Sequence, residues 1–250
     1  MDAACAQLEA RAKARAQAGQ AEYERKVAAR AGREGSAKGP VPQPPRDTPG
    51  PDEQINLSDP DARLMRKSKR EGYTQSYNAQ AIVDADGSAL IVGQRVSCCA
   101  ADVGETEADL AAIPASLGAP TAALADCGFA DKATLERLGR DHPELDLYIS
   151  VHREDAHAER RYDWRPLDKI KAPKAPTDPV LVAMAEKLKT PEGKARYRRR
   201  ASSVEPVFGI IKSALGFRQF LLRGLKKVSG EWNLVCLAYN LRRLHRVIAT

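Results

Sequence analysis

Runs of apolar residues divide the middle of the chain into short strands. Tyr77–Val83 and Ala89–Val96 lie on either side of Asp84–Gly87, whose Asp-Gly step favours a tight turn. This pattern predicts an antiparallel hairpin. Two shorter runs, Thr121–Ala125 and Leu145–Val151, are typical of buried strands.

Between and after these strands the apolar residues recur at helical spacing. Helices are predicted over Glu105–Leu117, which Pro114 should kink or shorten, over Asp131–Arg140, and from Asp178 or Pro179 to about Leu188. Residues 152–178 are charged and contain proline, so an irregular insertion is expected there. The order of hairpin, helix, strand, helix, strand and helices predicts an α/β fold, a mixed sheet covered by helices.

The last quarter of the chain predicts two further helices. Ser203 is expected to cap a helix from Val204 to about Leu215, with Pro206 tolerated in its first turn. Ser229 is expected to cap the final helix. Six apolar residues of that helix are expected to face inward: Trp232, Val235, Leu237, Leu241, Leu244 and Ile248.

The N-terminal part has a different composition. Residues 1–34 are rich in Ala, Arg, Glu and Gln, which predicts a helix with little apolar surface to bury. Residues 35–54 carry six prolines and are expected to form an extended linker. The compact domain is therefore expected to cover residues 55–250.

Charge changes the picture, because the excess of basic residues is local. The 250 residues hold 40 Lys and Arg against 33 Asp and Glu, a net charge of +7. From Ala185 to Thr250 there are 15 basic residues against 4 acidic ones. The basic run from Lys194 to Arg200 includes Tyr197 and indicates phosphate contact, although such runs often form only a solvated surface.

Other features of composition exclude several protein classes. No apolar run approaches the roughly 18 residues of a membrane span, and the N-terminus has no hydrophobic signal core. The five cysteines lack metal-ligand spacing and suit free thiols in a reducing compartment. We therefore expect a cytoplasmic protein with no membrane partner.

Two acidic residues are the main candidates for chemistry. Asp126 follows a predicted buried strand, where sites form in α/β sheets, although it could equally be a turn or cap residue. Glu205 accompanies Tyr197, Arg200 and Lys212, a set that suits a phosphodiester site in which acids hold a metal and the other groups hold phosphate. The alternative for Glu205 is an acid that complements the dipole in the first turn of its helix.

Four motifs resemble one protein family. They are Asn56–Asp61 (NLSDPD), Gly72–Gln80 (GYTQSYNAQ), Ala125–Phe129 (ADCGF) and Val204–Lys212 (VEPVFGIIK). In this order they closely resemble the C-terminal part of bacterial DDE-type insertion-sequence transposases, from about Ile55 to Val247. The resemblance implies a ribonuclease-H-like fold and a metal site for Mg²⁺ or Mn²⁺.

The resemblance also implies roles for single residues. Asp126 corresponds to the second acid of the DDE triad and Glu205 to the third, so both are expected to bind metal. Tyr197, Arg200, Glu205 and Lys212 match the family's Tyr-Arg-Glu-Lys signature. The implied partner is DNA, as transposon ends and target, with self-association in a transpososome.

One family feature has no match in this sequence. The first catalytic Asp of the family lies on the first, central strand of the sheet, but no apolar strand bearing Asp occurs before Tyr77. We therefore expect a truncated or split transposase that lacks its first strand, with backbone groups of the sheet left unpaired. Cleavage and strand transfer in DNA transposition are the implied activity, and the chain alone is expected to have little of it. The alternative functions are a non-catalytic DNA-binding remnant and, from composition only, an interaction protein that uses the Ala-rich helix.

Overall fold

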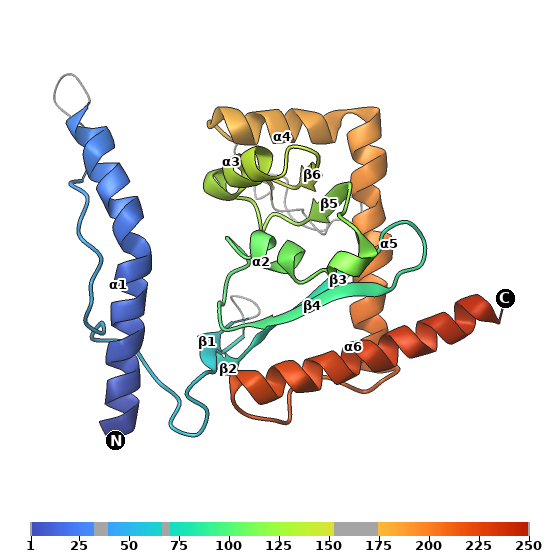
Figure 1. Ribbon diagram of the computed structural model, residues 1–250, viewed down its shortest axis with the longest axis horizontal. Coiled ribbons are helices and arrows are strands. Elements are labelled where there is room, and N and C mark those ends of the chain that lie inside the picture. The colour runs from blue at the N-terminus through green and yellow to red at the C-terminus, as the bar shows by residue number, and fades with distance from the viewer. Residues whose placement is uncertain (1, 33–39, 67–70, 153–174, 250) are drawn as a thin grey trace, which may run out of the picture. The chain divides into compact units, whose positions relative to one another are not determined.

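The computed structural model describes residues 2–32, 40–66, 71–152 and 175–249, and the chain divides into two units, residues 1–76 and 77–250 (Figure 1). In the first unit, α1 (Asp2–Ala31) forms the predicted Ala-rich helix. The Pro-rich segment returns along it, since Arg15 pairs with Glu53 at 3.0 Å and the ring of Pro45 lies against Gly19. This unit ends in two short antiparallel strands, β1 (Arg63–Met65) and β2 (Thr74–Ser76).

The second unit begins with the predicted hairpin. Strands β3 (Asn78–Val83) and β4 (Ile91–Ser97) pair antiparallel, which confirms the prediction. Asp84 closes the turn between them, because its carboxylate accepts hydrogen bonds from the backbone N–H groups of Asp86 and Ser88. The turn chemistry read from the sequence therefore holds the hairpin ends together.

Two more strands pair in parallel. They are β5 (Ala122–Ala125) and β6 (Asp146–Ile149), joined by α3 (Lys132–Asp141). Asp131 caps α3 by accepting from the N–H of Thr134 at 3.0 Å. These elements match the predicted strand, helix and strand.

Of the two effects predicted for Pro114, the structure shows a shortened helix and no kink. Helix α2 (Thr106–Ala111) stops before the proline, and a single 3₁₀ turn, η1 (Ala115–Leu117), follows it. Arg95 on β4 pairs with Asp109 at 2.9 Å and with Glu105, which ties α2 to the hairpin. Helix α2 is therefore positioned by this ion-pair cluster as well as by its apolar residues.

The predicted start of the next long helix is wrong. After α4 (Pro179–Lys189), which begins where predicted and is capped by Asp178, α5 runs from Pro191 to Ser213. Ser203 lies inside α5, where its hydroxyl donates to the carbonyl of Arg199 at 2.8 Å and so does not cap a helix. The corner between α4 and α5 needs glycine, since a Cβ on Gly193 would lie 2.0 Å from the carbonyl oxygen of Lys187.

The predicted start of α6 (Leu225–Ile248) is wrong, because Gly224 precedes the helix and Ser229 lies inside it and does not cap it. Its predicted inward face is wrong in part. Trp232 is buried and Val235 is partly buried, but Leu237, Leu241, Leu244 and Ile248 are exposed. The helix carries two apolar stripes, and polar groups select the inner one. Its Trp232 indole N–H donates to the carbonyl of Gln80 at 2.9 Å, and the side chain of Asn240 bonds both backbone groups of Ile91 at 2.8 Å. Apolar spacing alone does not distinguish the two stripes.

The strands form three separate two-stranded sheets, so the α/β class is confirmed but the predicted single mixed sheet is not formed among the described residues. One hydrophobic cluster packs β3 and β4 against α5 and α6 around Trp232 and Val207. A second packs β5 and β6 against α3 and α4 around Leu138 and Ile149. Helix α5 contacts both β3 and the β5–β6 pair and so joins the two halves (Figure 1).

No helix among the described residues is long and apolar enough to cross a membrane. The predicted irregular insertion at residues 152–178 lies mostly outside the described residues.

Candidate functional site

Asp126 lies directly after β5, at the carboxyl end of that strand. Its Oδ1 accepts a hydrogen bond from the backbone N–H of Gly128 at 2.8 Å, so the turn role considered from the sequence is present. Its Oδ2 faces Arg200 Nη2 at 3.2 Å. The same carboxylate therefore shapes its turn and pairs with a cation on α5.

Glu205 lies inside α5, five residues after Arg200 and more than three turns from the N-terminus of the helix. Its Oε1 is 3.7 Å from Arg200 Nη1, and its side chain is 64% exposed. The influence of a helix dipole fades within the first turn. The interpretation of Glu205 as an acid that complements the N-terminus of its helix is therefore wrong, because the helix begins at Pro191.

Arg200 is the group that brings the two acids together. Its side chain is only 19% exposed, and its two terminal nitrogens face different carboxylates, Asp126 and Glu205. The two acids come from a strand end and a helix that are far apart in the sequence. Both carboxylates nevertheless face the guanidinium of Arg200.

The other two signature residues lie on the same helix. Tyr197 is half-buried, one turn before Arg200. Lys212 is exposed near the end of α5, with its Nζ 5.7 Å from the centre of the Phe208 ring. No ion pair joins Lys212 to Asp126 or Glu205 among the described side chains. The structure thus groups Asp126, Arg200 and Glu205, with Tyr197 and Lys212 displaced along α5.

A third acid lies beside this group, and sequence reasoning missed it. Asp102 Oδ1 accepts hydrogen bonds from the side-chain amides of Asn78 and Gln80, both at 2.8 Å. A Cβ on Gly128 would lie 2.9 Å from Asp126 Oδ1 and 3.1 Å from Asp102 Oδ2, so both carboxylates border this glycine. The signal was the alternation of Asn78 and Gln80 with alanine on β3, which places two amides on one face of the strand.

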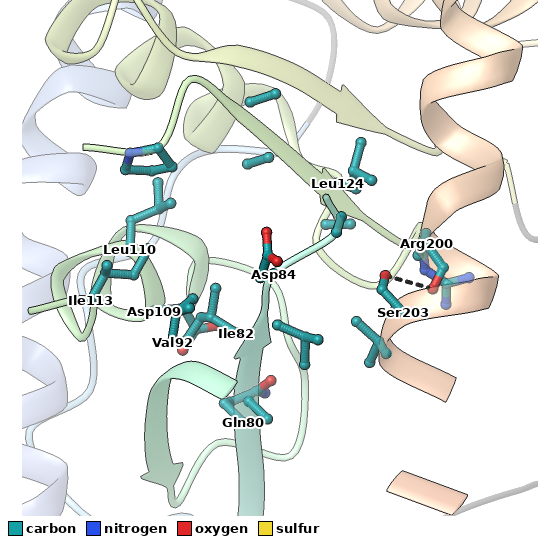
Figure 2. Close-up of a pocket in the computed structure, with 18 of the residues that line it drawn as sticks. Gln80, Ile82, Asp84, Val92, Asp109, Leu110, Ile113, Leu124, Arg200 and Ser203 are labelled. Carbon is teal, nitrogen blue, oxygen red and sulfur yellow. Dashed lines mark hydrogen bonds between the residues drawn. The ribbon is translucent and has the colours of Figure 1, made fainter. Parts of the chain in front are cut away.

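A cavity of about 700 Å³ adjoins these groups (Figure 2). Asp102 and Asp126 line it, and so do Arg196, Arg199 and Arg200 from α5. Asp109 lines it from α2; burial raises the pKa of this carboxyl above its ordinary value in spite of the ion pair with Arg95. The cavity wall is therefore charged where α5 approaches the end of β5.

The metal expected from the sequence can be tested against the donor set. Among the residues with described positions, no group of three His, Cys, Asp or Glu side chains could hold a metal ion. Two carboxylates do surround one position, and a guanidinium now provides the positive charge there. Such a pair suits a Mg²⁺ ion that keeps most of its water ligands, but it does not make the three-acid site of the resemblance.

The surface of α5 beside the acids is strongly basic. Lys194, Arg196, Arg198 and Arg199 are exposed on its first half. Arg199 also pairs with Asp86 of the hairpin turn at 2.5 Å. Exposed cations along a helix can contact a polyanionic backbone, and the charge asymmetry seen in the sequence is concentrated here.

Comparison with known proteins bears directly on this helix. No curated protein and no solved structure matches the chain. One family model does match, over residues 172–245, which include α4, α5 and most of α6. Arg200, Glu205 and Lys212 lie within the matched residues, whereas Asp126 lies outside them. The matched model is that of the transposase DDE domain, and it confirms the predicted resemblance to this family over residues 172–245.

Proposed function

We propose that this chain is a transposase domain with a ribonuclease-H-like arrangement that binds DNA and cleaves and joins its strands with the help of divalent metal. The observation that carries the proposal is the meeting of Asp126 and Glu205 at Arg200. One acid follows a strand at its carboxyl end, where α/β proteins form their sites, and the other comes from the helix that the transposase family model matches.

Asp126 and Glu205 are the residues that would hold the metal. A bound Mg²⁺ or Mn²⁺ supplies charge stabilisation and activates the attacking oxygen in phosphoryl transfer. Arg200 occupies the position between the acids in the described structure. When the guanidinium turns toward a phosphate, both carboxylates gain free lone pairs. The guanidinium of Arg200 can thus pair either with the two carboxylates or with a DNA phosphate.

The remaining residues of α5 position the nucleic acid. Arg196 and Arg199 line the cavity next to Arg200, and Lys194 and Arg198 extend the basic surface along the helix. Arginine binds phosphate oxygens in a fixed, bidentate geometry. Tyr197 adds a hydroxyl one turn from Arg200, and Lys212 adds a cation farther along the same helix. Self-association on DNA remains part of this proposal.

The test is metal-dependent nicking of duplex DNA that carries transposon-end sequences, with the purified chain. We expect nicking with Mg²⁺ or Mn²⁺ that Asp126→Asn abolishes, while DNA affinity changes less than about twofold, because removing the acid leaves the basic helix intact. The matched control is Asp141→Asn, an exposed acid on α3 that pairs with Arg140. Nicking that persists in Asp126→Asn would contradict the assigned role.

A second candidate function is a DNA-binding protein without catalysis. It is favoured by the pairing of both acids with Arg200 and by the lack of a three-acid group among the described residues. In that case the chain binds DNA with a steep dependence on salt but shows no nicking with any divalent metal. The same assay therefore separates the two functions.

A further inference from the structure

The cavity of about 700 Å³ runs between the two halves of the second unit. It is lined by every residue of β3, Asn78 to Val83, and by every residue of β5, Ala122 to Ala125. A cavity over the face of a sheet would contact alternate residues, because side chains alternate between the faces. Consecutive lining residues mean that the cavity runs along the edges of both strands.

Neither of these edges carries a strand in the described part of the chain. β3 pairs only with β4, and β5 pairs only with β6. The carbonyls of Thr121 and Ala125 accept from Asp146 and Ser150 on the β6 side. Since backbone groups alternate in direction along a parallel strand, those of Ala122 and Leu124 point to the opposite edge, toward the cavity. Such rows of backbone donors and acceptors are templates for another strand.

The other two sides of the cavity are formed by α2 with the turn that follows it and by α5, and they contribute polar as well as apolar groups. Figure 2 shows the apolar Leu110 and Ile113 on one side and the polar Ser203 and Arg200 of α5 on the other. Val204 and Phe208 of α5 also line the space. A strand with a helix against each face is buried on both sides and needs an almost continuous apolar sequence.

The separation of these strands into two pairs also explains why the hydrophobic residues form two clusters. One cluster lies at β3–β4 and the other at β5–β6, and α5 passes from one to the other. The cavity occupies the space between them. An added strand bonded to both edges would join the two pairs into one sheet with the order β4, β3, added strand, β5, β6.

We propose that this cavity is a binding slot for one extended, apolar strand supplied by a second polypeptide, which hydrogen-bonds to the free edges of β3 and β5. The inference goes beyond the proposed function, because it concerns what completes the sheet and not the chemistry at Asp126. Main-chain hydrogen bonds supply affinity in this mode of recognition, and the apolar walls select the side chains.

The experiment uses the full chain and a fluorescent peptide of about six residues, the length of β3, composed of valine and isoleucine with a lysine at each end. We expect saturable binding, measured by fluorescence anisotropy without DNA or metal. We also expect hydrogen exchange at the Ala122 and Leu124 amides to slow by at least about tenfold, because ordered backbone bonds protect amides.

Two analogues of the peptide are the matched controls. Each carries N-methyl groups on alternate peptide bonds, so that one analogue loses its donors toward β3 and the other loses those toward β5, while the side chains stay the same. Each analogue should bind at least about tenfold more weakly. Binding of either analogue as tight as that of the parent peptide, absence of binding by the parent peptide, or protection confined to residues outside β3 and β5 would overturn the proposal. DNA nicking is measured separately, so failure of the slot leaves the proposed function standing, and the reverse also holds.

Discussion

Arg200 is the residue of the second unit that pairs with both candidate acids. Its guanidinium lies 3.2 Å from Asp126 and 3.7 Å from Glu205, and it is mostly buried. The carboxylates of Asp126 and Glu205 are 42% and 64% exposed, and ion pairs with exposed partners contribute little to stability. The group is better explained by what the two acids do when the guanidinium turns away from them. We therefore relate Arg200 to ligand binding at the site more than to the stability of the fold.

A second single-residue feature is the buried thiol of Cys236 on α6. Burial raises its pKa to about 12, so the thiol stays protonated at neutral pH. Cys5 and Cys99 are exposed. We predict that a thiol reagent at pH 8 modifies Cys5 and Cys99 in the folded protein and modifies Cys236 only after denaturant is added, as peptide mass mapping will show. Rapid modification of Cys236 in the native state would contradict the packing of α6.

The same pKa predicts how stability depends on pH. The unfolded chain loses the Cys236 proton near the ordinary value of 9.0, whereas the folded chain keeps it to about 12. Between pH 9 and 12 the folded state therefore binds more protons than the unfolded state. The stabilisation that the retained Cys236 proton provides is fully present below pH 9 and is lost as pH rises toward 12. We predict that the melting temperature falls between pH 8.5 and 11, and that Cys236→Ala reduces the slope of that decrease. An unchanged slope in the variant would exclude this cause.

Helix α6 shows what sequence pattern resolves and what it does not. Its helical character was predicted, but its start was not, because the helix begins at Leu225 and Ser229 lies inside it. Four of the six residues expected to face inward are exposed. The helix has apolar residues on two faces. The choice between them depends on the hydrogen bonds of Trp232 and Asn240 to the hairpin, which are long-range contacts that no local pattern contains.

We predict opposite results for two substitutions in α6. Trp232→Ala should lower the free energy of unfolding by about 3–5 kcal/mol, because the side chain is 2% exposed and leaves a cavity. Leu241→Ala should change it by less than about 0.5 kcal/mol, because Leu241 is 59% exposed. Denaturant titration measures both. A larger loss for Leu241→Ala than for Trp232→Ala would mean that the helix is rotated relative to the described structure.

Helix α5 offers a matched pair of glycines. A Cβ at Gly193 would meet the Lys187 carbonyl, whereas nothing lies within 4 Å of a Cβ at Gly209. Gly193→Ala is expected to destabilise the protein by about 1–3 kcal/mol, through strain at the corner between α4 and α5. Gly209→Ala is expected to stabilise it by about 0.5–1 kcal/mol, because alanine loses less backbone entropy in a helix. Thermal melts of both variants test where α5 begins.

The beginning of α5 also shows the limit of capping signals. Ser203 followed by an apolar segment resembles a helix start, and Pro206 resembles a first-turn proline. In the structure Thr190 caps the helix, accepting from the N–H of Gly193 at 2.9 Å, and Pro206 lies in its interior. Glu205 was therefore identified by its resemblance to a family motif, while its position in the helix was misjudged. Two local signals competed, and packing of α5 against two sheets favoured the longer helix.

The basic surface of α5 and the two acids were predicted from different features of the sequence. The basic residues predicted from charge lie on α5, and the strand end that carries Asp126 was predicted from its apolar run. Their meeting at Arg200, and the place of Asp102 beside them, depends on tertiary packing. The sequence predicted the residues better than the geometry that connects them.

The basic surface leads to a prediction about salt. If α5 contacts DNA phosphates, Arg198→Gln should weaken binding of any duplex by a similar factor and reduce the slope of log affinity against log salt by about 1. Arg140→Gln on α3 is the matched control, because Arg140 is exposed and pairs with Asp141 outside this surface. Electrophoretic mobility shifts at several salt concentrations measure both slopes. Equal slopes for the two variants would remove α5 from the DNA contact.

The central claim, that Asp126 and Glu205 share one cationic position, is tested most directly by Mn²⁺ binding, measured by electron paramagnetic resonance. Arg200→Gln removes the positive charge between the acids, so Mn²⁺ affinity should rise by about thirtyfold, which corresponds to roughly 2 kcal/mol for a unit charge and a divalent ion 4 Å apart in water. Adding either Asp126→Asn or Glu205→Gln to Arg200→Gln should abolish that gain. A gain that survives the loss of either acid, or no gain at all, would show that the two carboxylates do not act on the same ion.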